Sequence, residues 1–372
     1  MLEVFWSKVV QATAKRPSDK AATTGSSWLE ALDTRRYDVG GTIQTLVADR
    51  YVLTARAAAA WQRHDHRFGD VRERDDYTPR DVPRFAYTYD VPGLFAQDDV
   101  DVATWVSVSA GARVDWHSEY GMFMSPRVAA LFRAGAWTSR LSVGRGFSAA
   151  TPLTEESEAA GLTRLDAPRP LRAEQGTSVS LDVTRTVGLI TITATAFGSR
   201  VAHPLTVERD TRYALVNRDG ASTNMGAELL AIARSGPWVA TASYAYVRSR
   251  EDGERGRQDV ALTPRHGAGL VGMWEDEDWG RVGLEFYYTG RQRLEVNPFR
   301  STSARYLVVG ALAEKRFGAI RLFLNAENLT NVRQTRWDSL LRPARGVDGR
   351  WTVDAWAPLD GRAINGGLRV AF

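Results

Sequence analysis

The chain has 372 residues, no cysteine, and a formal net charge of +4 from 48 basic and 44 acidic side chains. The missing cysteines exclude disulfide frameworks, thiolate metal sites and cysteine nucleophiles. The balanced charge, without a basic run interleaved with aromatic residues, argues against a nucleic-acid partner. No stretch approaches the roughly 18 consecutive apolar residues of a membrane-spanning helix.

Residues 1–36 form an unassigned N-terminal segment, because the first recognisable strand lies near Tyr37. This segment does not resemble a secretory signal: Glu3 stands where a basic region is expected, and Lys8 interrupts the apolar run. If the protein leaves the cytoplasm, we expect its export signal to lie outside this sequence.

From residue 37 onward, alternating apolar and polar residues predict β-strands with one apolar and one polar face. Residues 105–116 alternate in this way, with Val106 and Trp116 in the apolar register and Arg113 in the polar one. Residues 178–184 repeat the pattern. Two later apolar registers are Val282, Leu284, Phe286 and Tyr288, and Ile364, Gly366, Leu368, Val370 and Phe372.

Two classes of connection separate these segments. Short turns at one end of the strands and long loops at the other are typical of an outer-membrane β-barrel. Counting between the connections gives about fifteen strands of roughly ten residues, the length that crosses a bilayer when tilted. A soluble β-sandwich would also alternate, but its strands are usually about five or six residues long. Tight junctions are predicted near 49–50, 135–136, 188, 235–237, 277–278 and 317–318, between mostly longer polar segments at about 67–84, 150–176, 204–222, 251–263, 294–303 and 332–361.

Several motifs in a fixed order resemble the barrel of TonB-dependent outer-membrane receptors. Residues 93–132 resemble a strand with a Phe-x-Gln-Asp core that leads by a short turn into a Gly-x-Arg-x-Asp strand, followed by Ser-Pro-Arg. Residues 144–158, GRGFSAATPLTEESE, look like the Gly-Phe-x-x-Pro stretch of that family. Later matches are NMGAELLA at 224–231, LTPRH at 262–266, YYTGRQ at 287–292, NAENLTN at 325–331 and INGGLRVAF at 364–372.

The resemblance implies an all-β, antiparallel transmembrane β-barrel of the outer-membrane receptor type. Complete receptors of this type have about 22 strands and a plug domain in the lumen. The present chain would hold about fifteen of them, with 37–372 as a partial barrel that lacks the plug and the early strands. We therefore expect the C-terminal part of a receptor, from a partial gene or a misplaced start codon.

The function implied is active uptake of a scarce nutrient across the bacterial outer membrane, with a ferric siderophore, cobalamin or an oligosaccharide as possible cargo. Expected partners are outer-membrane lipid, lipopolysaccharide and the outer-membrane assembly machinery. The energy-coupling protein is a partner only if the parent protein contains the missing plug. The alternative from another class is a non-transporting structural or adhesive surface β-protein.

The C-terminal strand has a second implied role. In such barrels a C-terminal aromatic strand is recognised by the assembly machinery, so Leu368, Val370 and Phe372 are expected to form part of an insertion signal. An ordinary edge strand in a soluble sheet is the alternative explanation of the same alternation.

The last long loop, residues 332–362, is rich in arginine and tryptophan. Arginine can bind carboxylates or phosphates through two hydrogen bonds, and tryptophan offers flat stacking area, so the loop could hold an anionic ligand such as a metal chelate. Lipopolysaccharide phosphates are an equally good partner, and a loop folded on its own aromatic residues is the third interpretation. The candidate ligand-binding residues are Arg336, Trp337, Arg342, Arg345, Arg350, Trp351 and Trp356.

The sequence gives little support for a catalytic or metal-binding site. His64, Asp65 and His66 place two imidazoles on one strand face, but a metal site needs further ligands and none can be placed. Glu155, Glu156 and Glu158 fit a solvated loop better than an acid–base pair. Because nucleophile-elbow, Walker and zinc-protease motifs are absent from the sequence, we expect no enzyme, no metal and no cofactor.

Overall fold

The computed structural model describes residues 2–15, 28–47, 51–70, 87–151, 166, 170–209, 213–253, 256–295, 297–346 and 350–370. Apart from Val39, side chains are described only from residue 57 onward, and not for 64–70. Within these ranges the secondary structure is nineteen β-strands and one 3-10 turn, η3 (Gln334–Arg336). Three strands have four or five residues, and the other sixteen have 8 to 20, against about fifteen predicted.

All described strand pairs are antiparallel, so the predicted all-β, antiparallel class is confirmed. None of the described segments forms a helix long and apolar enough to span a membrane. The strands are β1 (Leu2–Lys15), β2 (Trp28–Val47), β3 (Tyr51–Asp70), β4 (Tyr87–Ala103), β5 (Val106–His117), β6 (Gly121–Ala134), β7 (Trp137–Ser148), β8 (Glu174–Val187), β9 (Ile190–Ala202), β10 (Leu205–Arg209), β11 (Tyr213–Asn217), β12 (Ala221–Ser235), β13 (Trp238–Gly253), β14 (Gly256–Asp259), β15 (His266–Asp276), β16 (Gly280–Thr289), β17 (Tyr306–Phe317), β18 (Ile320–Glu327) and β19 (Ala363–Val370).

The chain divides into two compact units, and five of the strands, β6 to β9 and β12, contribute residues to both, β12 only its first residue to unit 1. Unit 1 consists of Met1–Leu131, Ser142–Ser178 and Val201–Ala221, and unit 2 of Phe132–Leu141, Val179–Arg200 and Ser222–Phe372. Strand β1 and the first part of β2 lie within residues 1–36, the segment that the sequence pattern left unassigned.

In unit 1, strands β1 to β5 pair in chain order. The end of β5 shows the predicted alternation: Trp116 is 42% exposed, whereas its neighbours Asp115 and His117 are buried. The long polar segment predicted at 204–222 contains a small separate hairpin, β10 and β11. At this end of β5 the alternation positions the apolar side chain outward and the polar ones inward, whereas Val106, in the same predicted apolar register at the other end of the strand, is buried.

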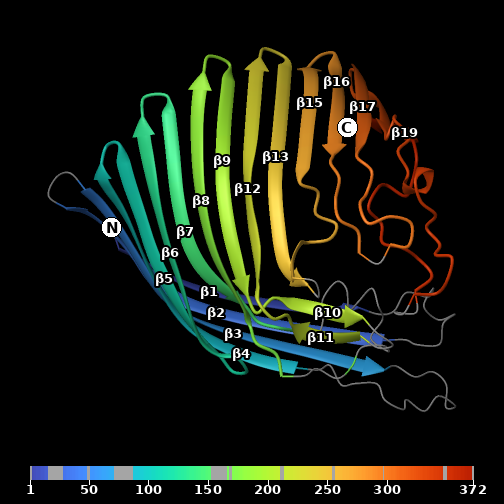
Figure 1. Cartoon of the computed structure of the whole chain (residues 1–372). Helices are drawn as coiled ribbons and strands as arrows, with labels where there is room; N and C mark the ends of the chain where they lie inside the picture. The colour runs from blue at the N-terminus through green and yellow to red at the C-terminus, as the bar shows by residue number, and fades with distance from the viewer. Residues whose placement is uncertain are drawn as a thin grey trace. The chain divides into compact units, whose positions relative to one another are not determined.

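In unit 2, β12, β13, β15, β16, β17, β18 and β19 lie side by side in chain order (Figure 1). Their registers define two faces. One face, called the apolar face, includes the cross-strand row Trp238, Trp274, Val282, Ala313, Leu324 and Gly366. The opposite face, called the polar face, includes the row Glu275, Arg281, Glu314 and Phe323.

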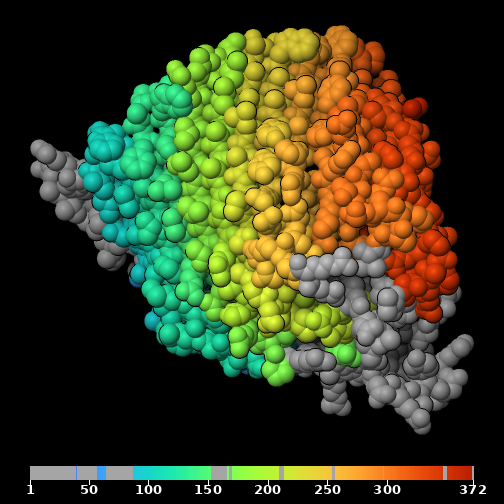
Figure 2. All heavy atoms as spheres, in the orientation of Figure 1, coloured from blue at the N-terminus to red at the C-terminus, as the bar shows by residue number. Residues whose placement is uncertain are grey.

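Exposure on these two faces is inverted relative to a water-soluble protein. On the apolar face Leu284 is 49% exposed and Leu324 54%, whereas Glu314 on the polar face is only 4% exposed. Glu314 lies between Arg281 and Arg321, with N–O distances of 3.4 and 3.2 Å. An apolar outer face and a polar inner face are what a strand in a membrane barrel requires. Figure 2 shows one face of these strands with all heavy atoms drawn, in yellow to red.

Glycine forms the tight turns. Four two-residue turns have glycine at the first position with a positive φ, as a type II′ hairpin turn requires: Gly135 at 59°, Gly188 at 56°, Gly236 at 54° and Gly318 at 62°. These four lie where tight junctions were predicted, whereas the junction predicted at 49–50 lies outside the described residues.

Candidate functional site

The loop between β18 and β19, residues 328–362, is anchored by Asn328 in unit 2. Asn328 has a φ of 50° and is 8% exposed. Its Nδ2 donates to the carbonyl of Val332 at 2.8 Å and to that of Asp360 at 3.1 Å, and its Oδ1 accepts the amide of Val332 at 2.8 Å. One buried side chain therefore fastens the beginning of the loop to its end.

A second buried amide, Gln334, organises the middle of the loop. It begins η3 and is 0% exposed. Its Nε2 donates to the carbonyl of Asp354 at 3.0 Å, and its Oε1 accepts the amide of Trp356 at 2.8 Å. Its own amide donates to the carbonyl of Pro358 at 2.8 Å. Both polar atoms of the Gln334 side chain therefore have hydrogen-bond partners. The side chain holds two distant parts of the loop together and leaves none of its own polar atoms unpaired.

Trp356 is the centre of a small apolar cluster. It is 4% exposed and packs with Leu294 and Ala357, while Tyr306 and Trp337 cover the edge of the cluster. The ring centroids of Trp337 and Trp356 lie 5.3 Å apart at an interplanar angle of 40°. The loop therefore has a hydrophobic core of its own, built with residues from the preceding long segment.

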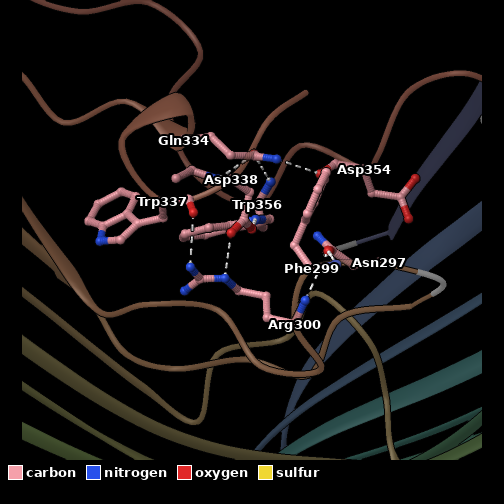
Figure 3. A network of polar contacts seen from close by, with 9 residues as sticks. Asn297, Phe299, Arg300, Gln334, Trp337, Asp338, Asp354 and Trp356 are labelled. Carbon is pink, nitrogen blue, oxygen red and sulfur yellow. Dashed lines mark hydrogen bonds and ion pairs between the residues drawn. The ribbon is translucent and has the colours of Figure 1, made fainter. Parts of the chain in front are cut away.

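An ion pair joins that preceding segment to the loop (Figure 3). Arg300 Nε lies 2.6 Å from Asp338 Oδ1, and the carboxylate of Asp338 is completely buried. Trp356 Nε1 donates to the second oxygen of Asp338 at 3.2 Å, and Arg300 Nη2 donates to the carbonyl of Trp337 at 3.1 Å. Asn297 Oδ1 accepts the amides of Phe299 and Arg300, which fixes the turn from which the arginine projects.

The predicted ligand-binding residues occupy three different environments. Arg342 and Trp356 are buried. Trp337 and Arg350 are partly buried, and Arg350 Nη1 lies 2.8 Å from Asp354 Oδ1. Arg336, Arg345 and Trp351 are exposed, the last to 55%, and Arg336 Nη1 donates to the carbonyl of Thr330 at 3.4 Å. The structure thus brings Trp337 into contact with Trp356. The three exposed residues lie on the same loop, whose inner part contains the buried and partly buried ones.

Besides Asn328, three residues that organise this loop were missed in the sequence: Arg300, Gln334 and Asp338. The Asn297–Pro298 pair is a turn signal and could have placed Arg300 at a turn. The partner of Arg300 lies 38 positions away, and neither residue is in a motif. Only the fold brings this pair together.

The other predicted residues are less informative. His64, Asp65 and His66 lie in β3, where His64 pairs with Thr34 of β2, but their side chains are outside the described set. The glutamates at 155, 156 and 158 lie outside the described residues altogether. Among the residues that the structure describes, no three His, Asp or Glu side chains gather as a metal site would need.

In the predicted insertion signal, Leu368 is 65% exposed and Val370 39%, and both lie on the apolar face through pairing with Leu322 and Ile320. Phe372 lies outside the described residues. The fold shows that these residues lie on the apolar face, but it does not test whether the assembly machinery recognises the strand. That role stays a prediction.

The chain is similar to several solved receptors. It matches the siderophore receptor PirA of Acinetobacter baumannii with a TM-score of 0.71 at 13% identity, covering 100% of this chain and 59% of that one. It matches a mutant of the ferric enterobactin receptor PfeA of Pseudomonas aeruginosa at 0.70 and 14%, covering 100% and 62%. It matches the ferric-catecholate import receptor Fiu of E. coli K12 at 0.62 and 12%, covering 98% and 60%.

These identities are low, so the structural matches show a shared fold and no more. The chain spans about three fifths of the length of these receptors. No curated protein sequence matches it. The family model described as "TonB dependent receptor-like, beta-barrel" matches residues 6–329, most of the chain. The chain therefore belongs to the TonB-dependent receptor β-barrel family.

Proposed function

We propose that the protein is an outer-membrane receptor for active uptake of a scarce nutrient, and that its cargo is an anionic ferric chelate. The observation that supports this most directly is the family match over residues 6–329. Solved receptors with the same fold include ones described as siderophore, ferric enterobactin and ferric-catecholate import receptors. Cobalamin and oligosaccharides are the other cargo classes named by the sequence resemblance.

The loop after β18 supplies a suitable surface for such a ligand. Arg336 and Arg345 are exposed cations, and Trp351 presents an exposed aromatic face. Guanidinium groups bind carboxylate or catecholate oxygens in a planar, two-bond geometry. The buried core around Trp356 supports this loop, so a ligand would meet a partly preorganised surface.

Localisation and energy coupling follow from the same proposal. The apolar face of unit 2 would contact outer-membrane lipid, and long loops such as 328–362 would face the medium. Coupling to inner-membrane energy needs a plug domain, so an in-frame plug and signal sequence in the DNA upstream of Met1 would make the parent protein a complete receptor. Assembly machinery and lipopolysaccharide remain expected partners.

A binding experiment tests the cargo class. The full chain in detergent is titrated with a ferric catecholate, a ferric hydroxamate, cobalamin and a maltooligosaccharide, and tryptophan fluorescence is followed. A ferric chelate should quench strongly, and the double variant Arg336→Gln/Arg345→Gln should bind about 100-fold more weakly, about tenfold for each lost charge-assisted hydrogen bond.

The matched control for that experiment is Arg140→Gln/Arg234→Gln, which removes the same charge from exposed arginines near the tight turns. It should bind the chelate as the intact chain does. Binding of cobalamin or the oligosaccharide alone would reassign the cargo. Absence of binding to all four probes would overturn the receptor proposal in favour of a non-transporting surface protein.

A further inference from the structure

A group of charged residues continues the apolar face of unit 2 beyond its aromatic residues, at the long-loop end of β12 and β13. The cross-strand pairs on this face run from Ser235–Trp238 through Leu229–Tyr244 to Met225–Arg248 and Thr223–Arg250. Since side chains on one face recur every second residue, Arg248 and Arg250 project from the same face as Tyr244. These arginines therefore lie on the lipid-facing side of the sheet and not on the side that faces the lumen.

Two aromatic levels mark the edges of the apolar face. At the short-turn end, Trp238, Trp274 and Trp279 are neighbours, with centroid distances of 6.5 and 5.1 Å between successive rings. At the other level, Tyr244 Oη lies 2.8 Å from His266 Nδ1, and the ring of Tyr246 lies 5.3 Å from that of His266. Aromatic residues with polar atoms concentrate at both interfaces of outer-membrane barrels.

The height of the arginines follows from strand geometry. Each residue advances about 3.3 Å along a strand, and a tilt of about 40° reduces this to about 2.5 Å of height. Tyr246, eight residues beyond Trp238, therefore lies about 20 Å above it, and Arg248 and Arg250 lie about 25 and 30 Å above it. The apolar band of such barrels is about 25 Å tall. The arginines therefore coincide with the headgroup layer of the outer leaflet.

The cluster at this height has an excess of positive charge. Strand β14 adds Asp259, opposite Arg250, and Arg257, opposite Asp252. Arg257 Nη1 lies 3.2 Å from Asp252, and Arg265 also pairs with Asp259. The hydrogen bond from Arg265 holds the pKa of Asp259 below its usual range, so this carboxylate stays ionised near neutral pH. Four arginines (Arg248, Arg250, Arg257, Arg265) then face two aspartates, a net charge of +2.

Two of these arginines have unused hydrogen-bonding capacity. Arg248 Nε and Arg250 Nε are shielded from solvent and have no hydrogen-bond partner in the described part of the chain. Arg250 approaches Asp259 only to 3.7 Å. Buried donors without partners are rare in proteins. Both side chains are also partly exposed, so a group with several anionic oxygens on this face could bind the two guanidinium groups.

We propose that Arg248 and Arg250 bind the phosphate of a phosphorylated outer-leaflet lipid of the lipid A type. The inference rests on the proposed outer-membrane location. It concerns a different site from the arginines of the 328–362 loop, because this cluster lies on the lipid-facing side of β13 and β14. The aromatic level formed by Tyr244, Tyr246 and His266 lies below the phosphate, where the acyl chains begin.

The test measures lipid A binding to the full chain in dodecyl maltoside. Fluorescent bis-phosphorylated lipid A is the probe, dephosphorylated lipid A is the chemical control, and inorganic phosphate is the competitor. Arg248→Gln/Arg250→Gln should weaken binding about 30-fold, about fivefold for each arginine near a charged lipid surface. Arg248→Lys/Arg250→Lys should recover most of it, and Arg140→Gln/Arg234→Gln should bind as the intact chain does.

Each alternative outcome has a defined meaning. The site would be overturned if the Arg248/Arg250 and Arg140/Arg234 glutamine variants lost the same affinity for lipid A. It would also be overturned if dephosphorylated lipid A bound as tightly as the phosphorylated form. If millimolar inorganic phosphate displaced the fluorescent lipid A, the site would bind free phosphate, and the proposal that its ligand is a lipid would be overturned. Circular dichroism checks that each variant keeps its β signal, and an intact chain without that signal would refute the register on which the site depends. Loss of ferric chelate binding with lipid A binding retained would refute the proposed cargo and leave this site standing.

Discussion

Leu284 tests the assignment of the apolar face to lipid. It lies four residues from Gly280 at the turn end of β16, which is about 10 Å of height and close to the middle of the apolar band. It is 49% exposed, and its cross-strand neighbours are the small residues Gly272 and Ala311. Leu284→Arg should therefore meet lipid and not protein, and should lower the free energy of unfolding by about 2–4 kcal/mol.

The matched control is the same substitution at Leu312, which lies on the other face at nearly the same height, one residue away. Leu312 lies in β17 opposite Gly283, in the polar-face register. Leu312→Arg adds a charge toward water, so its cost should stay below about 1 kcal/mol.

The assay for this pair is urea unfolding of the full chain in phosphatidylcholine vesicles, with the midpoint compared at unchanged slope. If both variants lose the same stability, or if Leu312→Arg loses more, the faces have been assigned wrongly. The comparison isolates the direction of the side chain, because the residue type and the new charge are matched and the heights differ by only about 2.5 Å.

Three further predictions use other parts of the chain. Single cysteines along 281–288 should react alternately with a water-soluble thiol reagent, with the odd-numbered positions labelled, and uniform labelling would exclude a barrel wall. Asp338→Asn should leave Arg300 without its anion and destabilise the loop by about 2–3 kcal/mol, seen as faster hydrogen exchange, whereas Asp354→Asn should cost about 1 kcal/mol or less. Deletion of Phe372 should reduce outer-membrane assembly of the parent protein about tenfold, and heat-modifiable mobility equal to that of the intact parent would contradict this.

The strands and turns could be predicted because each depends on local residues. Alternation in 280–288 gives the register that the structure shows, with Leu284 exposed and Glu285 on the opposite face. The turns at Gly188 and Gly318 could be located because a type II′ turn needs a positive φ that glycine adopts without strain. Such signals need no knowledge of distant parts of the chain.

The loop core could not be predicted, because it depends on contacts between distant residues. The sequence shows that 332–362 is rich in arginine and tryptophan, but it does not distinguish ligand contacts from internal packing. Arg342 is buried and Arg345 exposed, although the two are three positions apart. The pairing of Arg300 with Asp338 decides which of the aromatic residues is covered, and no local pattern marks it.

The inverted strands also explain why the loop needs a core of its own. On the strands of unit 2, large apolar side chains such as Leu284 and Leu324 face outward, so they cannot pack against a loop that lies beyond the end of the sheet. A long segment in water loses too much conformational entropy to be ordered by a few surface contacts. Trp356 and the buried Asp338–Arg300 pair supply the water-excluding contacts that the sheet does not offer. Any ligand preference of this loop therefore depends on residues that would not touch the ligand, and substitutions at Trp356 should change affinity through loop order.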